Sequence, residues 1–188
     1  MKFLIAGLGN IGPEYELTRH NIGFLTLDRM AENHKAIFTT TRLADKADFK
    51  YKGKQIHLIK PNTYMNLSGK AVSYWMNDLK ISRDNLLVVV DDMALPFATI
   101  RMRSQGSSAG HNGLAHIEET LGDRNYNRLR MGIGNNFSKG GQVDFVLGNF
   151  DKAEFEALPA YMDKAIDAIL AFCTIGAERA MNLHNTRI

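Results

Sequence analysis

The sequence predicts a single-domain α/β fold, in which a twisted, mixed but mostly parallel sheet is flanked by helices. Strand-like and helix-like segments interleave along the whole chain, which is the pattern of α/β proteins. The segment Leu86–Val90 is apolar throughout and indicates a central strand that is buried on both faces. The 188 residues contain no repeat, linker or low-complexity run, so we expect one domain over residues 1–188.

The spacing of apolar residues predicts the elements in order. Apolar runs or alternation predict strands at residues 3–6, 86–90, 98–103, 128–133 and 143–146, and a hairpin within 46–59. Helical spacing predicts helices at residues 21–34, 63–79 and 113–121. A long last helix is expected from Pro159 to Met181, because proline is favoured in the first turn of a helix.

Composition narrows the function classes only a little. The formal charge of +3 permits an anionic partner without requiring one. The single cysteine, Cys173, excludes an internal disulfide, fits a reducing cytosol and is expected in the core. No apolar run approaches the roughly 20 residues of a membrane span, and the N-terminus does not resemble a signal peptide. We therefore expect a cytoplasmic protein that does not enter a membrane.

A glycine-rich run, Gly7 to Gly12, follows the first predicted strand and matches G-x-G-x-x-G. This pattern can bind a dinucleotide where a helix follows the turn and an acidic residue ends a second strand. Here Pro13 follows at once and disfavours a helical Gly12, and Asp28 lies inside a predicted helix. The interpretation that fits better is a tight turn that lets the chain pass close to another segment.

Polar residues gather where the predicted strands end, which is where ligands bind in α/β sheets. They are Asn10, His20, Asn66, Asp91, Asp92 and Asn112. Each alone has an ordinary structural explanation, such as a helix cap or a turn. Together they offer a base, an acid to orient it and neutral amides, which suits hydrolysis of an acyl bond by activated water. Ser68 lacks the G-x-S-x-G pattern of a nucleophile, and the histidines lack metal-binding spacing.

Several motifs then resemble those of bacterial-type peptidyl-tRNA hydrolases, in the same order and over nearly the whole chain. They are Gly7–Asn10 with Tyr15, Thr18–Asn21, Gly23, Pro61–Gly69, Gly110–Leu114, Arg128–Gly134 and Phe145–Leu147. The sequence departs from the family pattern at Ile11, where proline is usual, and at Tyr64, where phenylalanine is usual. It also departs at Val90–Pro96, where the family has a histidine before the aspartate and a further acid.

The resemblance implies a monomeric α/β enzyme that cuts the ester between a peptide and the 3′ end of tRNA. Such an enzyme recycles tRNA from peptidyl-tRNA released by stalled ribosomes. The resemblance implies no cofactor, no metal and no obligate protein partner. It makes His20 the general base and Asp91 its partner. The residues implied to hold substrate or water are Asn10, Tyr15, Tyr64, Asn66 and Asn112.

Basic residues add a further expectation. Arg101 and Arg103 are two positions apart in a predicted strand and so share one face, and Arg130 lies in a strand that could neighbour it. Spacing alone is equally compatible with a phosphate-binding patch and with a solvated face with ordinary ion pairs. The resemblance implies that Arg103 and Arg130 contact tRNA phosphate.

Two other function classes remain open on the sequence alone. One is a nucleotide-cofactor enzyme, which the context of the glycine-rich run disfavours. The other is an RNA-binding module without catalysis, since the family includes plastid relatives that act in RNA splicing. The presence of His20 and Asp91 favours catalysis.

Overall fold

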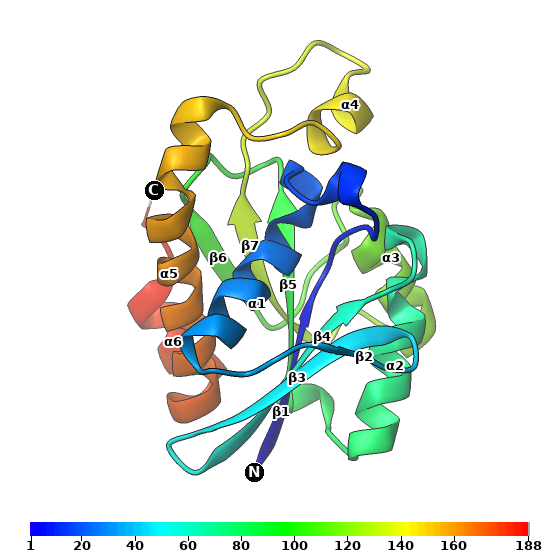
Figure 1. Ribbon diagram of the computed structural model, residues 1–188, viewed down its shortest axis with the longest axis vertical. Helices are drawn as coiled ribbons and strands as arrows, with labels where there is room; N and C mark the ends of the chain where they lie inside the picture. The colour runs from blue at the N-terminus through cyan, green and yellow to red at the C-terminus, as the bar shows by residue number, and fades with distance from the viewer. Residues whose placement is uncertain (188) are drawn as a thin grey trace.

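Strands from most of the chain form one sheet in the computed structural model, which describes residues 1–187 (Figure 1). Within these residues the sheet has seven strands in the order β2-β3-β4-β1-β5-β7-β6. Their bounds are β1 Lys2–Gly7, β2 Thr39–Thr40, β3 Ala44–Tyr51, β4 Lys54–Pro61, β5 Leu86–Asp92, β6 Ile100–Arg103 and β7 Asn127–Gly132. The four central strands are parallel, and both edges pair antiparallel. This confirms the predicted mixed sheet with a parallel centre.

Helices cover both faces of this sheet and enclose a hydrophobic core on each (Figure 1). On one face lie α1 (Ile22–Asn33), α5 (Lys152–Ile175) and α6 (Ala177–His184), and on the other α2 (Ser68–Leu79) and α3 (Asn112–Leu121). The short helix α4, Gln142–Val146, lies beyond the carboxyl ends of the parallel strands. Across residues 1–187, none of the helices has both the length and the apolar character that crossing a membrane requires.

Most predicted elements are confirmed, but the strand predicted at residues 143–146 is wrong. This segment is the helix α4, and its side chains face two ways: Val143 and Val146 line a crevice, whereas Phe145 contacts Arg19. Four residues are too few to tell a buried strand from one turn of a helix by periodicity. The helix predicted from residue 63 also begins later, at Ser68, after a 3-10 turn at Met65–Leu67.

The long helix predicted from Pro159 to Met181 is in fact two helices. The first, α5, begins at Lys152, because Asp151 and Glu154 form a capping box there. Pro159 therefore lies inside α5 on its exposed side, where water can satisfy the carbonyl that the proline leaves without a partner. Gly176, with φ +90° and ψ 165°, ends the run before α6 begins.

The glycine-rich run at the end of β1 is a tight turn, as expected. After Gly12 comes a 3-10 turn at Pro13–Tyr15, and α1 begins only at Ile22, so the turn lacks the helix N-terminus that binds a pyrophosphate. Gly7 and Gly9 of this run, together with Gly23 on α1, instead allow α1 to approach the sheet. A Cβ on Gly23 would lie 2.6 Å from the Val89 carbonyl oxygen and 2.7 Å from the Leu8 nitrogen. This contact fixes the start of α1 beside the ends of β1 and β5.

We predict that Gly23→Ala destabilises the protein by roughly 1–3 kcal/mol or more, because every close neighbour of the added methyl is rigid backbone. Urea unfolding measures the change. The control is Asn33→Ala, at an exposed position on the same helix α1. The control should change the free energy of unfolding by less than about 0.5 kcal/mol. Equal effects of the two variants would show that the contact between α1 and the sheet is not tight.

Candidate active site

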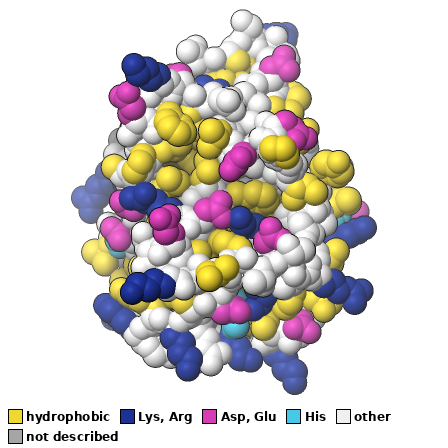
Figure 2. All heavy atoms as spheres, viewed as in Figure 1, with side chains coloured by type: hydrophobic (Ala, Val, Ile, Leu, Met, Phe, Trp, Pro, Cys, Tyr) yellow, Lys and Arg dark blue, Asp and Glu magenta, His cyan; other side chains and the backbone are white. Residues whose placement is uncertain are grey.

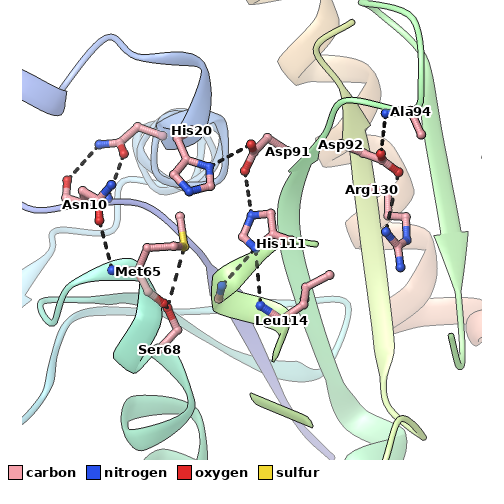
Figure 3. A network of polar contacts seen from close by, with 12 residues as sticks. Asn10, His20, Met65, Ser68, Asp91, Asp92, Ala94, His111, Leu114 and Arg130 are labelled. Atoms are coloured by element: carbon pink, nitrogen blue, oxygen red, sulfur yellow. Dashed lines mark hydrogen bonds and ion pairs between the residues drawn. The ribbon is translucent and has the colours of Figure 1, made fainter. Parts of the chain in front are cut away.

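Some of the polar residues predicted at the strand ends come together, and a histidine–aspartate pair lies at their centre. His20 belongs to a 3-10 turn, Arg19–Asn21, directly before α1, and Asp91 lies near the end of β5. The His20 Nδ1 atom lies 2.8 Å from Asp91 Oδ2, so the two side chains are hydrogen-bonded (Figure 3). The Asp91 side chain therefore faces His20, in the arrangement that the resemblance implies.

A second histidine, which the sequence analysis did not place here, binds the other oxygen of the same carboxylate. His111 Nε2 lies 2.8 Å from Asp91 Oδ1, and the two imidazole rings are 4.9 Å apart. Asp91 is 4% exposed, so its charge has lost nearly all contact with water. Burial raises the pKa of Asp91, but its two histidine partners outweigh that effect and hold the pKa well below its ordinary range. Asp91 is therefore a carboxylate at neutral pH.

The tautomer of His111 follows from its backbone contacts. His111 is the N-cap of α3, and its Nδ1 atom accepts the N–H groups of Gly113 and Leu114 at 3.1 and 3.3 Å. A nitrogen that accepts these bonds carries no proton, so the ring proton is on Nε2 and is donated to Asp91. His111 is accordingly placed to donate to Asp91 through Nε2.

His20 is in a different electrostatic position. Burial by itself lowers the pKa of His20, but the charge of Asp91 and the hydrogen bond to it outweigh burial and raise the pKa above its ordinary value. The bond to Asp91 engages Nδ1, which leaves Nε2 as the atom that can take up a proton from the crevice. The arrangement can therefore perform general base catalysis.

The three side chains also bring potential metal ligands within 4.8 Å of one another. Sequence spacing does not reveal this grouping, because His20 and His111 come from distant segments. Both nitrogens that face Asp91 already lie at hydrogen-bond distance from its two oxygens. The carboxylate and the imidazoles thus satisfy each other, and we call the group the Asp91 triad.

Asp92, the next residue, points away from the Asp91 triad (Figure 3). Its Oδ1 accepts the N–H of Ala94 at 2.8 Å, and its Oδ2 lies 3.6 Å from Arg130 Nη1. Consecutive residues of a strand face opposite sides of the sheet, which explains the separation.

Asn10 is held in a frame of hydrogen bonds beside His20. Asn21 binds the Asn10 backbone twice, through Oδ1 to the N–H at 2.8 Å and through Nδ2 to the carbonyl at 2.9 Å. The Asn10 Oδ1 atom accepts the N–H of Met65 at 3.0 Å. Because the oxygen is engaged, the Asn10 side chain has its Nδ2 donor left for a ligand.

A crevice of about 360 Å³ opens over the Asp91 triad. Among the predicted site residues, it is lined by His20, Asp91, Asn112 and Arg130. Other predicted site residues do not line it: Asn10, Tyr15, Tyr64, Asn66 and Arg103. Asn10 lines a second hollow with Glu16 and Lys60, whereas Tyr64 and Asn66 are exposed on the 3-10 turn and its approach. The crevice also contains residues that the sequence analysis missed: Ser108, His111, Asn135, Phe137, Gln142, Val143 and Val146.

The arginines of β6 and β7 form one row on a single face of the sheet. Arg101 pairs with Arg130 and Arg103 with Arg128, as expected for neighbouring strands. Arg128 is fully buried and donates to the carbonyls of Gly106 and Arg124. The Arg103 side chain is exposed and forms no ion pair or hydrogen bond with another residue in the range 1–187. The four arginines therefore have different environments despite their common spacing.

A sheet covered on both faces, with a buried His–Asp pair in a crevice at the carboxyl ends of its parallel strands, is the architecture of an α/β protein with a candidate active site. The chain matches the peptidyl-tRNA hydrolase family over residues 4–188. It is 57% identical to the peptidyl-tRNA hydrolase of Cytophaga hutchinsonii and 52% identical to that of Phocaeicola vulgatus, each over 187 residues and the full length of both chains. The crystal structure of peptidyl-tRNA hydrolase from Acinetobacter baumannii is similar with a TM-score of 0.91 at 31% identity, covering 98% of this chain and 94% of that one. The chain therefore belongs to the peptidyl-tRNA hydrolase family, which confirms the resemblance.

We predict that two substitutions of His111 separate its two contacts. His111→Ala should lower both stability, by about 1 kcal/mol for the lost helix cap, and turnover, by about ten-fold or more for the lost donor to Asp91. His111→Asn should retain the cap and the stability but show the same loss of turnover, because the shorter side chain does not reach Asp91. Thermal unfolding and steady-state kinetics measure the two effects. His116→Ala, also on α3, should keep full turnover, and wild-type turnover of His111→Asn would show that Asp91 does not need this donor.

Proposed function

We propose that this chain hydrolyses the ester bond between a peptide and the 3′ end of tRNA, with His20 as general base and Asp91 orienting it. The observation that carries the proposal is the buried His20–Asp91 pair at the crevice. Membership of the peptidyl-tRNA hydrolase family supports the choice of substrate.

The surroundings of His20 favour activated water over a covalent nucleophile. Among residues 1–187 its side-chain hydrogen-bond partner is Asp91 and not a serine or cysteine. The Ser68 hydroxyl is buried and donates to the Met65 carbonyl, and Cys173 is in the core, where burial raises its pKa to about 12. Neither side chain is placed to attack a substrate.

The proposed reaction has two steps. His20 Nε2 takes a proton from water as the water oxygen bonds to the ester carbonyl carbon, which gives a tetrahedral oxyanion and an imidazolium. The imidazolium then returns the proton to the ribose 3′ oxygen as the carbon–oxygen bond breaks, which leaves a peptide acid and a free tRNA end. Asp91 fixes the tautomer of His20 and stabilises the imidazolium between the steps.

Neutral amides complete the proposed site. The Asn10 and Asn112 side chains offer N–H donors that can stabilise the oxyanion or bind peptide backbone without adding charge. We place Tyr15, Tyr64 and Asn66 along the path of the substrate outside the crevice. The chain is proposed to act as a cytoplasmic monomer that recycles tRNA and needs no cofactor, metal or protein partner.

We predict that release of labelled peptide from peptidyl-tRNA falls about 10²–10⁴-fold in His20→Ala, while tRNA binding persists. Asp91→Asn should lose at least about a hundred-fold, and Asp92→Asn less than about five-fold, because Asp92 faces away from the triad. An RNA-binding module without catalysis would bind tRNA but release no peptide. A larger loss in Asp92→Asn than in Asp91→Asn would reverse the assignment of the orienting acid.

The same variants make a prediction about pH. The base must be neutral, and the pKa of His20 is raised, so kcat/KM should fall as pH decreases through a value above the ordinary 6.5. Asp91→Asn removes the charge that favours the imidazolium, so the acidic limb of its residual activity should move to lower pH. Asp92→Asn is the matched control and should keep the wild-type limb. If the acidic limb of the pH–activity profile lies at the same pH in Asp91→Asn as in the wild type, a group other than His20 sets its position.

Phosphate of the tRNA is proposed to lie along the row of arginines on β6 and β7. Arg103 is exposed, and a planar guanidinium can grip phosphate oxygens in pairs. Arg130 lines the crevice, and it also binds Asp92 and the Ser107 carbonyl, so it links the row to the site. Arg128 does not take part, because it is buried and satisfied by carbonyls.

We predict that Arg103→Ala raises KM for peptidyl-tRNA, leaves kcat nearly unchanged and flattens the log–log salt dependence by about 0.7–0.9. A peptide ester of the terminal adenosine alone should not respond. Lys50→Ala, which removes the same charge from an exposed position on β3 near the other edge of the sheet, is the control. If the short ester responds equally to Arg103→Ala, Arg103 acts on the reaction itself or on folding, and the phosphate contact is ruled out.

A further inference from the structure

One wall of the crevice is a lid, which we define as residues 135–148 with α4 inside it. Lid residues Asn135, Phe137, Gln142, Val143 and Val146 line the crevice opposite His20. Val143 is 64% exposed, so an apolar side chain is left uncovered at the edge of a polar site. The lid stands at the top of the molecule in Figure 1, and hydrophobic side chains gather on the upper half of the face shown in Figure 2.

The lid cannot hold its own conformation by helix formation. α4 has five residues, and so short a helix is unstable in isolation. Its N-cap, Gly141, makes no side-chain cap hydrogen bond. The position of α4 must therefore come from contacts with the rest of the protein.

Arg19 supplies such contacts from the side of α4 that faces away from the crevice. Its guanidinium lies 4.3 Å from the centre of the Phe145 ring, and Nη1 donates to the Phe145 carbonyl at 3.3 Å. Nη2 forms an ion pair with Glu154 at 3.1 Å, and Glu154 is part of the capping box of α5. The arginine side chain is 13% exposed, so these contacts are largely shielded from water.

The backbone reinforces the link between the lid and the His20 segment. The Arg19 N–H donates to the Gly148 carbonyl at 3.0 Å, and Thr18 forms a β-bridge with Asn149. The end of the lid is thus hydrogen-bonded to the residues directly before His20.

We propose that Arg19 is a positioning residue that holds the lid over the crevice, so that Val143 and Val146 form an apolar wall for the C-terminal side chain of the peptide. The proposal rests on the proposed function, because it assumes that the peptide enters this crevice. Arg19 acts through Phe145 and does not contact the reacting atoms.

The first experiment measures kinetics with N-acetyl-leucyl-tRNA and N-acetyl-glycyl-tRNA. In Arg19→Ala, KM for the leucyl substrate should rise about ten-fold, the loss expected for a shielded cation–π contact with its hydrogen bond, and kcat should change less than about three-fold. The glycyl substrate has no side chain to reach the wall and should respond less. Arg19→Lys keeps the positive charge but not the planar guanidinium, so its KM for the leucyl substrate should lie between those of the wild type and Arg19→Ala.

The matched control is Arg29→Ala. Arg29 also joins the N-terminal part of the chain to α5, through a two-pronged ion pair with Asp163 at 2.7 and 3.0 Å, but it does not touch the lid. Its loss should leave KM unchanged. A double-mutant cycle of Arg19→Ala with Phe145→Leu should be non-additive, because the two residues act through one contact.

The second experiment reads the lid without using activity. Lys139 is exposed in the lid, and limited trypsin digestion of the native protein should cut after it several-fold faster in Arg19→Ala than in the wild type or Arg29→Ala. Equal cutting in all three would overturn the proposal, as would an unchanged KM or additive effects with Phe145→Leu. An equal rise in KM for the leucyl and glycyl substrates would overturn the proposal that Val143 and Val146 contact the C-terminal side chain of the peptide. If His20 is not the base, His20→Ala will remain active, and the trypsin result for Arg19→Ala will be unaffected. The two failures can therefore be told apart.

Discussion

Asp91 is a carboxylate at the end of the central strand with almost no water around it. A buried charge costs several kcal/mol unless it is paired and hydrogen-bonded. Both of its oxygens receive an imidazole nitrogen at 2.8 Å, one from 71 residues earlier in the chain and one from 20 residues later. The need to satisfy this charge therefore fixes three distant segments against one another, and it sets the start of α3 and the ring orientation of His20 together.

The backbone can meet that requirement only because α1 approaches the sheet very closely. With Gly23 against Leu8 and Val89, the turn that carries His20 is held beside the end of β5 by contacts between main chains. Main-chain contacts have little freedom to relax, so the distance between His20 and Asp91 is set by the fold more than by side-chain flexibility. A rigid sheet edge thus faces a lid that depends on tertiary contacts, and the crevice lies between them.

The fold and part of the candidate site can be predicted from the sequence for identifiable reasons. The β-branched run of β5 and the alternation along strands are local signals, so the central strand and the neighbouring arginine strands could be predicted. The choice of Asp91 as the partner of His20 came from the family resemblance, because alternation says only that Asp91 and Asp92 face opposite ways. His111 could not be recognised as a partner of Asp91, because its contact joins separate segments, although its place before a helix in Gly110-His111-Asn112-Gly113 was a sign of a cap. Periodicity cannot distinguish a strand from a helix in the four residues 143–146. Pro159 predicts the start of the last helix too late, because the capping box of Asp151 and Glu154 begins α5 earlier in the chain. The arginines of β6 and β7 share one pattern, yet one is buried and another exposed, and only tertiary packing decides this.

The turn Arg19–Asn21 shows how three adjacent residues can serve three parts of the site. A 3-10 helix has three residues per turn, so consecutive side chains leave it about 120° apart. Arg19 points to Phe145 of the lid, His20 to Asp91, and Asn21 to the backbone of Asn10. In an α-helix the spacing would be about 100°, and in a strand the first and third side chains would share one face. One turn therefore contacts the lid, the Asp91 triad and the Asn10 turn at the same time. His20, the proposed base, lies between the residues that contact the lid and the Asn10 turn.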